Sequence, residues 1–128
     1  MAKIFKISNL HLSISIFIVI SIAFIYGFRP NLLFDVFINS IDERNIFKAM
    51  MGLYIGFALF WIFGIFNNKH WKTATISNII FMFGLGFGRI VSMLYDGIPC
   101  LLFVLGTVGE IALGIYAVFQ LKSFKDEQ

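Results

Sequence analysis

Residues 75–121 read TISNIIFMFGLGFGRIVSMLYDGIPCLLFVLGTVGEIALGIYAVFQL, and this stretch decides the fold. Two apolar runs, 75–95 and 100–121, are joined by the short turn Asp96-Gly97-Ile98-Pro99. Each run has about the 20 residues that an α-helix needs to cross the hydrocarbon core of a bilayer. Because backbone groups cannot stay unpaired in lipid, both runs are predicted to be transmembrane helices, and the tight turn makes them antiparallel neighbours.

Two further apolar runs precede this hairpin, at about 10–28 and 49–66. The 128-residue chain is 59% hydrophobic and 13% charged, a composition typical of a membrane protein. It predicts a single all-α domain over residues 1–128, built as a four-transmembrane-helix bundle in the lipid bilayer. Lys3 and Lys6 before the first run could begin a secretory signal, but the run is long and lacks a small-x-small cleavage site, which favours an uncleaved helix.

The connection between the first and second runs, residues 29–48, carries apolar side chains at helical spacing: Phe34, Phe37, Ile38 and Ile41. This pattern predicts a short amphipathic surface helix between helices 1 and 2. Ser40 followed by Glu43 resembles a capping box, so the second transmembrane helix is predicted to begin near Ile41.

Lysine and arginine in the short connections predict the orientation of a membrane protein. Six lysines flank one end of the predicted spans: Lys3, Lys6, Lys69, Lys72, Lys122 and Lys125. Three cations, mixed with acidic residues, flank the other end: Arg29, Arg44 and Lys48. The chain is therefore predicted to lie in the cell inner (plasma) membrane with its N- and C-termini cytoplasmic.

Two ionisable residues, Arg89 and Glu110, fall inside predicted spans. Each costs roughly 2.5–3.5 kcal/mol or more at the bilayer centre, so both are expected to face the bundle interior. Counted from the middle of the turn, their positions differ by about four residues, or about 6 Å along the helices. This offset is within reach of an arginine side chain and predicts an ion pair.

Other polar residues share helical faces with these two charges. They predict a polar pocket between helices two, three and four that opens away from the cytoplasm. The candidate ligand-binding residues are Arg89, Glu110, Ser92, Lys48, Asn45 and Asp96. Small residues predict close helix packing around the pocket, at Gly84, Gly88, Gly106 and Gly114, and on the second helix at Gly52 and Gly56.

The sequence contains few residues suited to binding a metal, a cofactor or nucleic acid. Cys100 is the single cysteine, and His11 and His70 are predicted to be interfacial, so no metal site and no cofactor are expected. The basic residues form no stripe interleaved with stacking groups, so no nucleic-acid partner is expected either. Tyr26 and Tyr54 are interpreted as interface anchors or packing residues.

The stretch from Asn45 to Tyr116 resembles a bacterial family of small membrane proteins known only as a domain of unknown function, number 4345. The resemblance rests on the segment Asn45–Tyr54, on Gly88-Arg89-Ile90-Val91-Ser92 with the following Asp96-Gly97-Ile98-Pro99, and on Glu110. It implies a four-helix membrane protein and supplies no activity. The family pattern has arginine where this chain has Lys48, and lysine lacks the planar geometry for two-pronged recognition of anions.

Three functions stay open at this stage. The first is the binding or transport of a small anionic or polar ligand, or a lipid head group, in the outward-facing pocket. The second is a structural or accessory subunit of a larger membrane complex or homo-oligomer, in which Arg89 and Glu110 are helix–helix glue. The third, an enzyme, is disfavoured because no base lies beside a nucleophile and no catalytic residues can be named.

Overall fold

The structure is a computed structural model that describes residues 3–126, with side chains described as far as residue 124. Its long elements are α1 (Leu10–Phe28), α2 (Ile41–Phe66), α3 (Asn68–Asp96) and α4 (Leu101–Asp126), and two short 3-10 turns, η1 (Ile7–Asn9) and η2 (Pro30–Leu32), accompany them. All four helices are long and apolar enough to cross a membrane. The predicted all-α fold with four long helices is therefore confirmed for the part of the chain that is described, and the length and apolar composition of these helices suit a multi-pass membrane protein.

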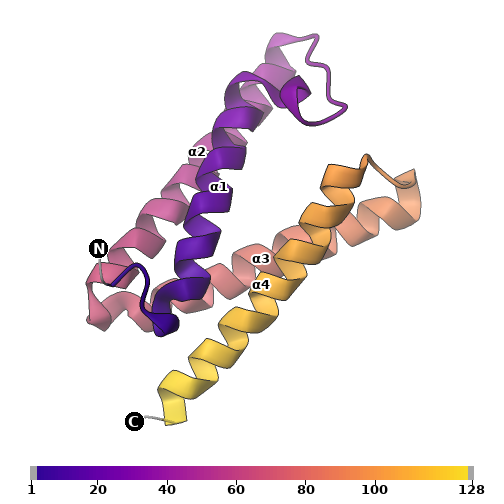
Figure 1. Cartoon of the computed structure of the whole chain (residues 1–128). Coiled ribbons are helices and arrows are strands. Elements are labelled where there is room, and N and C mark those ends of the chain that lie inside the picture. Colours follow the sequence, from indigo (N-terminus) through magenta and orange to yellow (C-terminus); the bar gives the residue numbers. More distant parts are fainter. Residues whose placement is uncertain (1–2, 127–128) are drawn as a thin grey trace.

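The four helices form two hairpins, α1–α2 and α3–α4 (Figure 1). Helices that follow one another in the chain pack together, whereas α1 and α4 touch only slightly. The connections 29–40 and 97–100 lie at one end of the bundle, which we call the loop end. The opposite end, which we call the lysine end, carries the exposed side chains of Lys3, Lys6, Lys69, Lys72 and Lys122. The side chain of Lys125 lies outside the described residues.

Specific backbone features begin and end these helices. Ser40 caps α2 as predicted, because its Oγ accepts from the Glu43 backbone N–H at 3.1 Å while Glu43 Oε2 accepts from the Ser40 N–H at 3.1 Å. Asn67 separates α2 from α3 and its Oδ1 accepts from the Lys69 N–H at 3.1 Å. At the other end of α3, Gly97 has φ 106°, a conformation that favours glycine and that turns the chain back into α4.

The predicted amphipathic surface helix between helices 1 and 2 is absent. Among residues 29–40 only η2 is helical, and residues 33–40 form bends and extended backbone. Phe34 explains the difference, since it enters the bundle, is 8% exposed, and stacks on Phe103 of α4 with ring centroids 4.2 Å apart. Phe37, one helical turn later in the predicted pattern, is 70% exposed. The pattern suggested that Phe34 and Phe37 lie on one apolar face of a helix, but of these two rings only Phe34 is buried.

The core lies mainly between α1, α2 and α3, where aromatic rings meet. Trp61 is fully buried, packs edge-on against Phe81 at 5.2 Å, and donates its indole N–H to Ser77 Oγ at 3.0 Å. The prediction that His11 is interfacial is wrong, because His11 is fully buried against α3 and its Nε2 lies 3.0 Å from Thr75 Oγ1. The flanking residues Leu10 and Leu12 do not predict that the His11 imidazole contacts a buried hydroxyl group.

Phe34→Ala is expected to destabilise the bundle by about 3 kcal/mol, because it removes a buried ring that joins the 29–40 connection to α4. Phe37→Ala, in the same connection but exposed, is the matched control and should change stability by less than about 0.5 kcal/mol. Unfolding in a mild detergent, followed by circular dichroism, measures both. Equal effects of the two substitutions would contradict the burial of Phe34 within the bundle.

Candidate functional site

The ion pair between Arg89 of α3 and Glu110 of α4 is present and is the centre of the candidate site. Arg89 Nε lies 3.1 Å from Glu110 Oε1 and 3.0 Å from Oε2, so one N–H is shared by both carboxylate oxygens. The Arg89 side chain is 22% exposed and that of Glu110 is 14% exposed. Arg89 precedes the end of α3 by seven residues, which places the pair about 10 Å from that end, in the loop-end half of the bundle.

Close packing of α3 against α4 positions the two charges. A Cβ atom added to Gly86 would overlap the side chain of Ile111, and one added to Gly114 would lie 2.9 Å from the ring of Phe83. Gly86 precedes Arg89 by three residues and Gly114 follows Glu110 by four, so each glycine brings the backbones together one turn from a charge.

Gly114 is one of the glycines that the sequence nominated for close packing, and the other nominated glycines behave differently. Gly84, Gly88 and Gly106 have no heavy atom within 4 Å of an added Cβ, and the same is true of Gly52 and Gly56 on α2. Their small size is therefore not used in packing within the described chain. The close approach of α3 and α4 depends instead on Gly86, which the sequence pattern did not single out, and on Gly114.

Two tyrosines complete the polar part of the site. Arg89 Nη2 donates to the Tyr26 hydroxyl at 3.0 Å, which ties the pair to α1. Tyr54 of α2 packs beside Tyr26, with ring centroids 5.7 Å apart, and its buried hydroxyl has no hydrogen-bond partner among the described residues. The guanidinium of Arg89 also lies 5.0 Å from the centre of the Phe103 ring. Sequence reasoning missed both tyrosines as site residues, because tyrosine in a membrane helix is more often a packing or interface residue.

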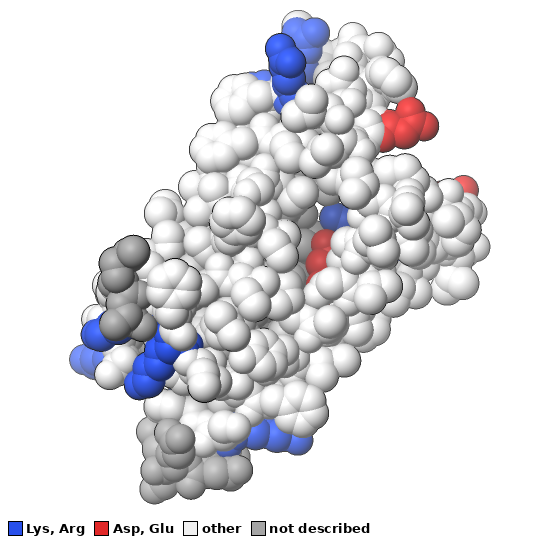
Figure 2. Space-filling view, viewed as in Figure 1, with Lys and Arg blue, Asp and Glu red and all other residues white. Residues whose placement is uncertain are grey.

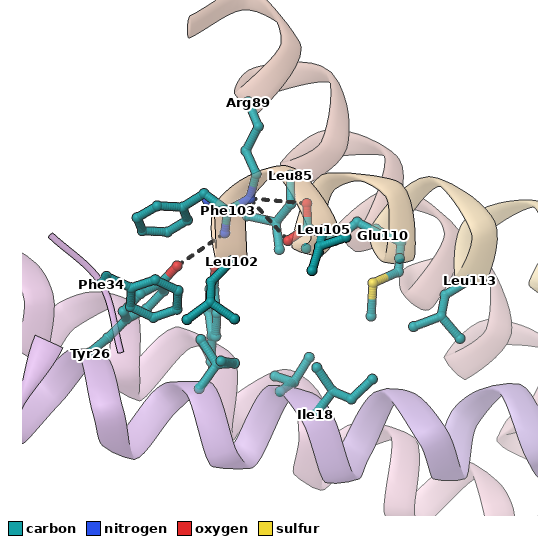
Figure 3. Close-up of a pocket in the computed structure, with 16 residues that line it drawn as sticks. Ile18, Tyr26, Phe34, Leu85, Arg89, Leu102, Phe103, Leu105, Glu110 and Leu113 are labelled. Carbon is teal, nitrogen blue, oxygen red and sulfur yellow. Dashed lines mark hydrogen bonds and ion pairs between the residues drawn. The ribbon is translucent and has the colours of Figure 1, made fainter. Parts of the chain in front are cut away.

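A cavity of about 320 Å³ lies next to the ion pair. Apart from Arg89 and Glu110, none of the described residues that line it is charged. Figure 3 shows Arg89, Glu110 and Tyr26 on one side of the cavity, with Ile18 and Leu113 on the side away from Arg89. Most of the remaining lining is aliphatic or aromatic: Val19, Ile22, Phe34, Met82, Leu85, Leu102, Phe103 and Leu105.

The cavity lies where α1 and α4 make little contact. Its lining residues on α1 run from Ile18 to Tyr26, about 12 Å along the helix. In the space-filling view, acidic and basic atoms are visible in a hollow within the otherwise uncharged middle of the molecule (Figure 2). The site thus combines one polar corner with a longer apolar part.

The other predicted site residues do not line this cavity. Ser92 donates to Asp96 at 2.9 Å, and both side chains are exposed near the end of α3. Lys48 donates to the Gly27 carbonyl at 2.9 Å, at the end of α1, and Asn45 is exposed one turn earlier on α2. The structure therefore brings together Arg89 and Glu110 of the predicted set. Whether any of the six residues binds a ligand stays a prediction.

The polar corner can offer hydrogen-bond donors to a ligand. Arg89 engages Glu110 through Nε and Tyr26 through Nη2, so both Nη1 donors are without a hydrogen-bond partner among the described residues. Among those residues no group of three or more His, Cys, Asp or Glu could hold a metal ion. The donors of Arg89 and the Tyr54 hydroxyl suit oxygen atoms of a polar group, and the rest of the cavity suits hydrocarbon.

The chain belongs to the family described as Domain of unknown function (DUF4345), whose model matches residues 7–121. The match includes all of α1, α2 and α3 and most of α4, and it covers the ion pair and the cavity lining. No curated protein and no solved structure matches the chain significantly. The description of the family names no activity.

The Arg89–Glu110 pair predicts coupled effects of neutralising substitutions. Arg89→Gln and Glu110→Gln are each expected to destabilise the bundle, because each leaves the partner charge uncompensated in an apolar setting. The double variant should recover part of the loss, with a coupling energy of about 0.5–3 kcal/mol. Unfolding of all four proteins in the same detergent measures this cycle, and additive effects would contradict a direct interaction.

Proposed function

We propose that the protein binds a single-chain amphiphile in the cavity beside Arg89. The polar head group lies at Arg89, Glu110, Tyr26 and Tyr54, and the hydrocarbon chain lies along the apolar lining of α1 and α4. One observation carries this proposal: the cavity has a single charged corner, and the remainder of its lining is almost entirely apolar. A ligand that fits it must therefore be polar at one end and apolar at the other.

The size and position of the cavity support the same class of ligand. Its volume of about 320 Å³ lies near the lower limit of small-molecule pockets, which range from roughly 300 to 1,000 Å³. That volume favours one chain with a small head group over a complete two-chain lipid. Because α1 and α4 touch only slightly, an amphiphile can enter between them from the surrounding bilayer.

The free donors of Arg89 favour a head group rich in acceptor oxygens, such as a phosphate or a carboxylate. Both Nη1 donors are without a described partner, whereas Glu110 balances the charge of the arginine through Nε. A balanced pair lowers the energetic cost of keeping Arg89 in an apolar setting before the ligand arrives. The ligand then gains hydrogen bonds that the protein leaves unused.

The location proposed for this activity is the cell inner (plasma) membrane, with the lysine end cytoplasmic. The support is the count of cations in sequence, since six lysines belong to the lysine end and only Arg29, Arg44 and Lys48 belong to the loop end. With this orientation the head group of the amphiphile lies in the outer half of the bilayer.

A structural or accessory role in a larger membrane complex is the second candidate. The observation that favours it is the open glycine face of α2, where Gly52 and Gly56 have no heavy atom within 4 Å of an added Cβ. Small residues of this kind let a neighbouring transmembrane helix approach closely. A stoichiometric membrane-protein partner after purification in mild detergent would support this role, and the ion pair would then be internal glue.

Gly106→Leu tests the binding proposal because Gly106 lines the cavity and has open space at its Cβ position, so the added side chain would occupy part of the cavity. Gly84→Leu is the matched control, since Gly84 is an equally open helical glycine that does not line the cavity. The probes are single-chain lipids with a phosphate, a carboxylate or an uncharged glycerol head. We expect the phosphate or carboxylate lipids to raise the Tm of the parent and of Gly84→Leu by about 5 °C or more at saturation.

In the same experiment Gly106→Leu should show no saturable rise, and Arg89→Gln should lose the preference for anionic head groups. The two anionic arms distinguish a phosphate head from a carboxylate head. Equal stabilisation of parent and Gly106→Leu would place the lipid elsewhere, and the absence of a saturable rise with every lipid would refute the proposal.

A further inference from the structure

A second group of polar side chains lies deep in the bundle, in the half nearer the lysine end. His11 and Ser15 come from α1, and Thr75 and Asn78 come from α3. All four are fully buried. His11 and Ser15 are one helical turn apart, as are Thr75 and Asn78, and His11 Nε2 lies 3.0 Å from Thr75 Oγ1. The matching spacing places the two pairs on faces of α1 and α3 that meet; we call them the inner cluster.

Most of the polar atoms of the inner cluster lack a partner. His11 Nδ1, Ser15 Oγ, and both Nδ2 and Oδ1 of Asn78 are buried without a hydrogen bond to any described residue. A carboxamide and a hydroxyl each offer both donors and acceptors. Buried polar atoms in native proteins are nearly always bonded to protein or to ordered water, because leaving them unpaired in an apolar interior is costly. Four such atoms lie on two helices that meet at the His11–Thr75 contact.

We propose that the inner cluster is an internal hydration site, in which ordered water bridges His11, Ser15 and Asn78. Water fits because it donates and accepts at once, as this mixture of groups demands. A metal ion fits poorly, since His11 is the only strong metal ligand of the four, and no group of three such ligands occurs among the described residues. An ionic ligand fits poorly as well, because the four side chains include no carboxylate, lysine or arginine.

Trp71 connects the inner cluster with a pocket at the lysine end. Trp71 packs edge-on against His11, with ring centroids 5.7 Å apart, and its buried Nε1 also lacks a partner among the described residues. Trp71 lines a pocket of about 240 Å³ at the lysine end, together with polar side chains that include Lys3, Lys6 and Asn68. The indole therefore stands between the inner cluster and this outer pocket.

The inner cluster is separated from the cavity beside Arg89. Val19 follows Ser15 by one turn of α1, Met82 follows Asn78 by one turn of α3, and both are almost fully buried. Both also line the cavity, so they form an apolar layer between it and the inner cluster. The bundle thus has two polar compartments, one facing each end, and water in the inner one reaches about the level of Ser15 and Asn78. This inference does not depend on the amphiphile proposal.

Hydroxyl-radical footprinting of the whole protein in lipid nanodiscs tests the site, with modified residues located by mass spectrometry. Radicals generated from water modify side chains that touch water, including buried ones beside ordered water. We expect His11 to be modified within about ten-fold of the rate of the partly exposed His70. Trp61 is the internal control, because it is fully buried and its N–H is satisfied by Ser77, so it should stay unmodified.

Asn78→Leu then tests the assignment, because leucine replaces the carboxamide with an apolar group and removes the hydrogen bonds that would hold the water. It should reduce modification of His11 by about five-fold or more, while Asn45→Leu, the same change at an exposed site on α2, should not alter it. If His11 in the parent is as unreactive as Trp61, or if Asn78→Leu leaves its modification unchanged, the hydration site is refuted. Should Asn78→Leu fail to fold, the comparison of His11 with Trp61 in the parent still decides.

Discussion

The structure depends on one constraint: the opposite charges of Arg89 and Glu110 must lie together within helices whose other residues are mostly apolar. An arginine or a glutamate alone in a transmembrane helix carries a large penalty, so Arg89 and Glu110 have to meet. They meet because a tight turn at Gly97 makes α3 and α4 antiparallel and because Gly86 and Gly114 let the two helices approach closely. Tyr26 extends the arrangement to α1 through its bond with Arg89.

The position of the pair supports the proposed binding role better than a purely structural one. Charges that only joined two helices would be expected at the α3–α4 contact with their hydrogen-bonding groups satisfied. Here both Nη1 donors of Arg89 are unpaired among the described residues, and both charged side chains line a cavity where α1 and α4 hardly touch. The same pair therefore joins α3 to α4 and supplies the charged corner of a cavity whose other described lining is largely apolar.

The sequence predicted what depends on hydropathy and on position along a helix. Four apolar runs predicted four helices. The numbers of residues that separate Arg89 and Glu110 from the turn between their helices predicted that the two charges would pair. It did not predict what depends on how each helix is rotated. Lys48 lies on α2 with a plausible spacing but turns to the end of α1, and His11 faces Thr75 across the bundle rather than the interface. Apolar periodicity alone likewise could not tell that Phe34 enters the core while Phe37 stays exposed.

The central claim, that an amphiphile occupies the space between α1 and α4 beside Arg89, is tested most directly by photo-crosslinking in membranes. The probe is a single-chain, phosphate-headed lipid with a diazirine in its hydrocarbon chain, and mass spectrometry locates the adducts. The account predicts adducts on the cavity-lining segments 18–22 and 102–109, reduced by an excess of the unlabelled lipid. Adducts spread over the exposed apolar surface, such as the Gly52–Phe60 face of α2, and insensitive to competition would contradict it.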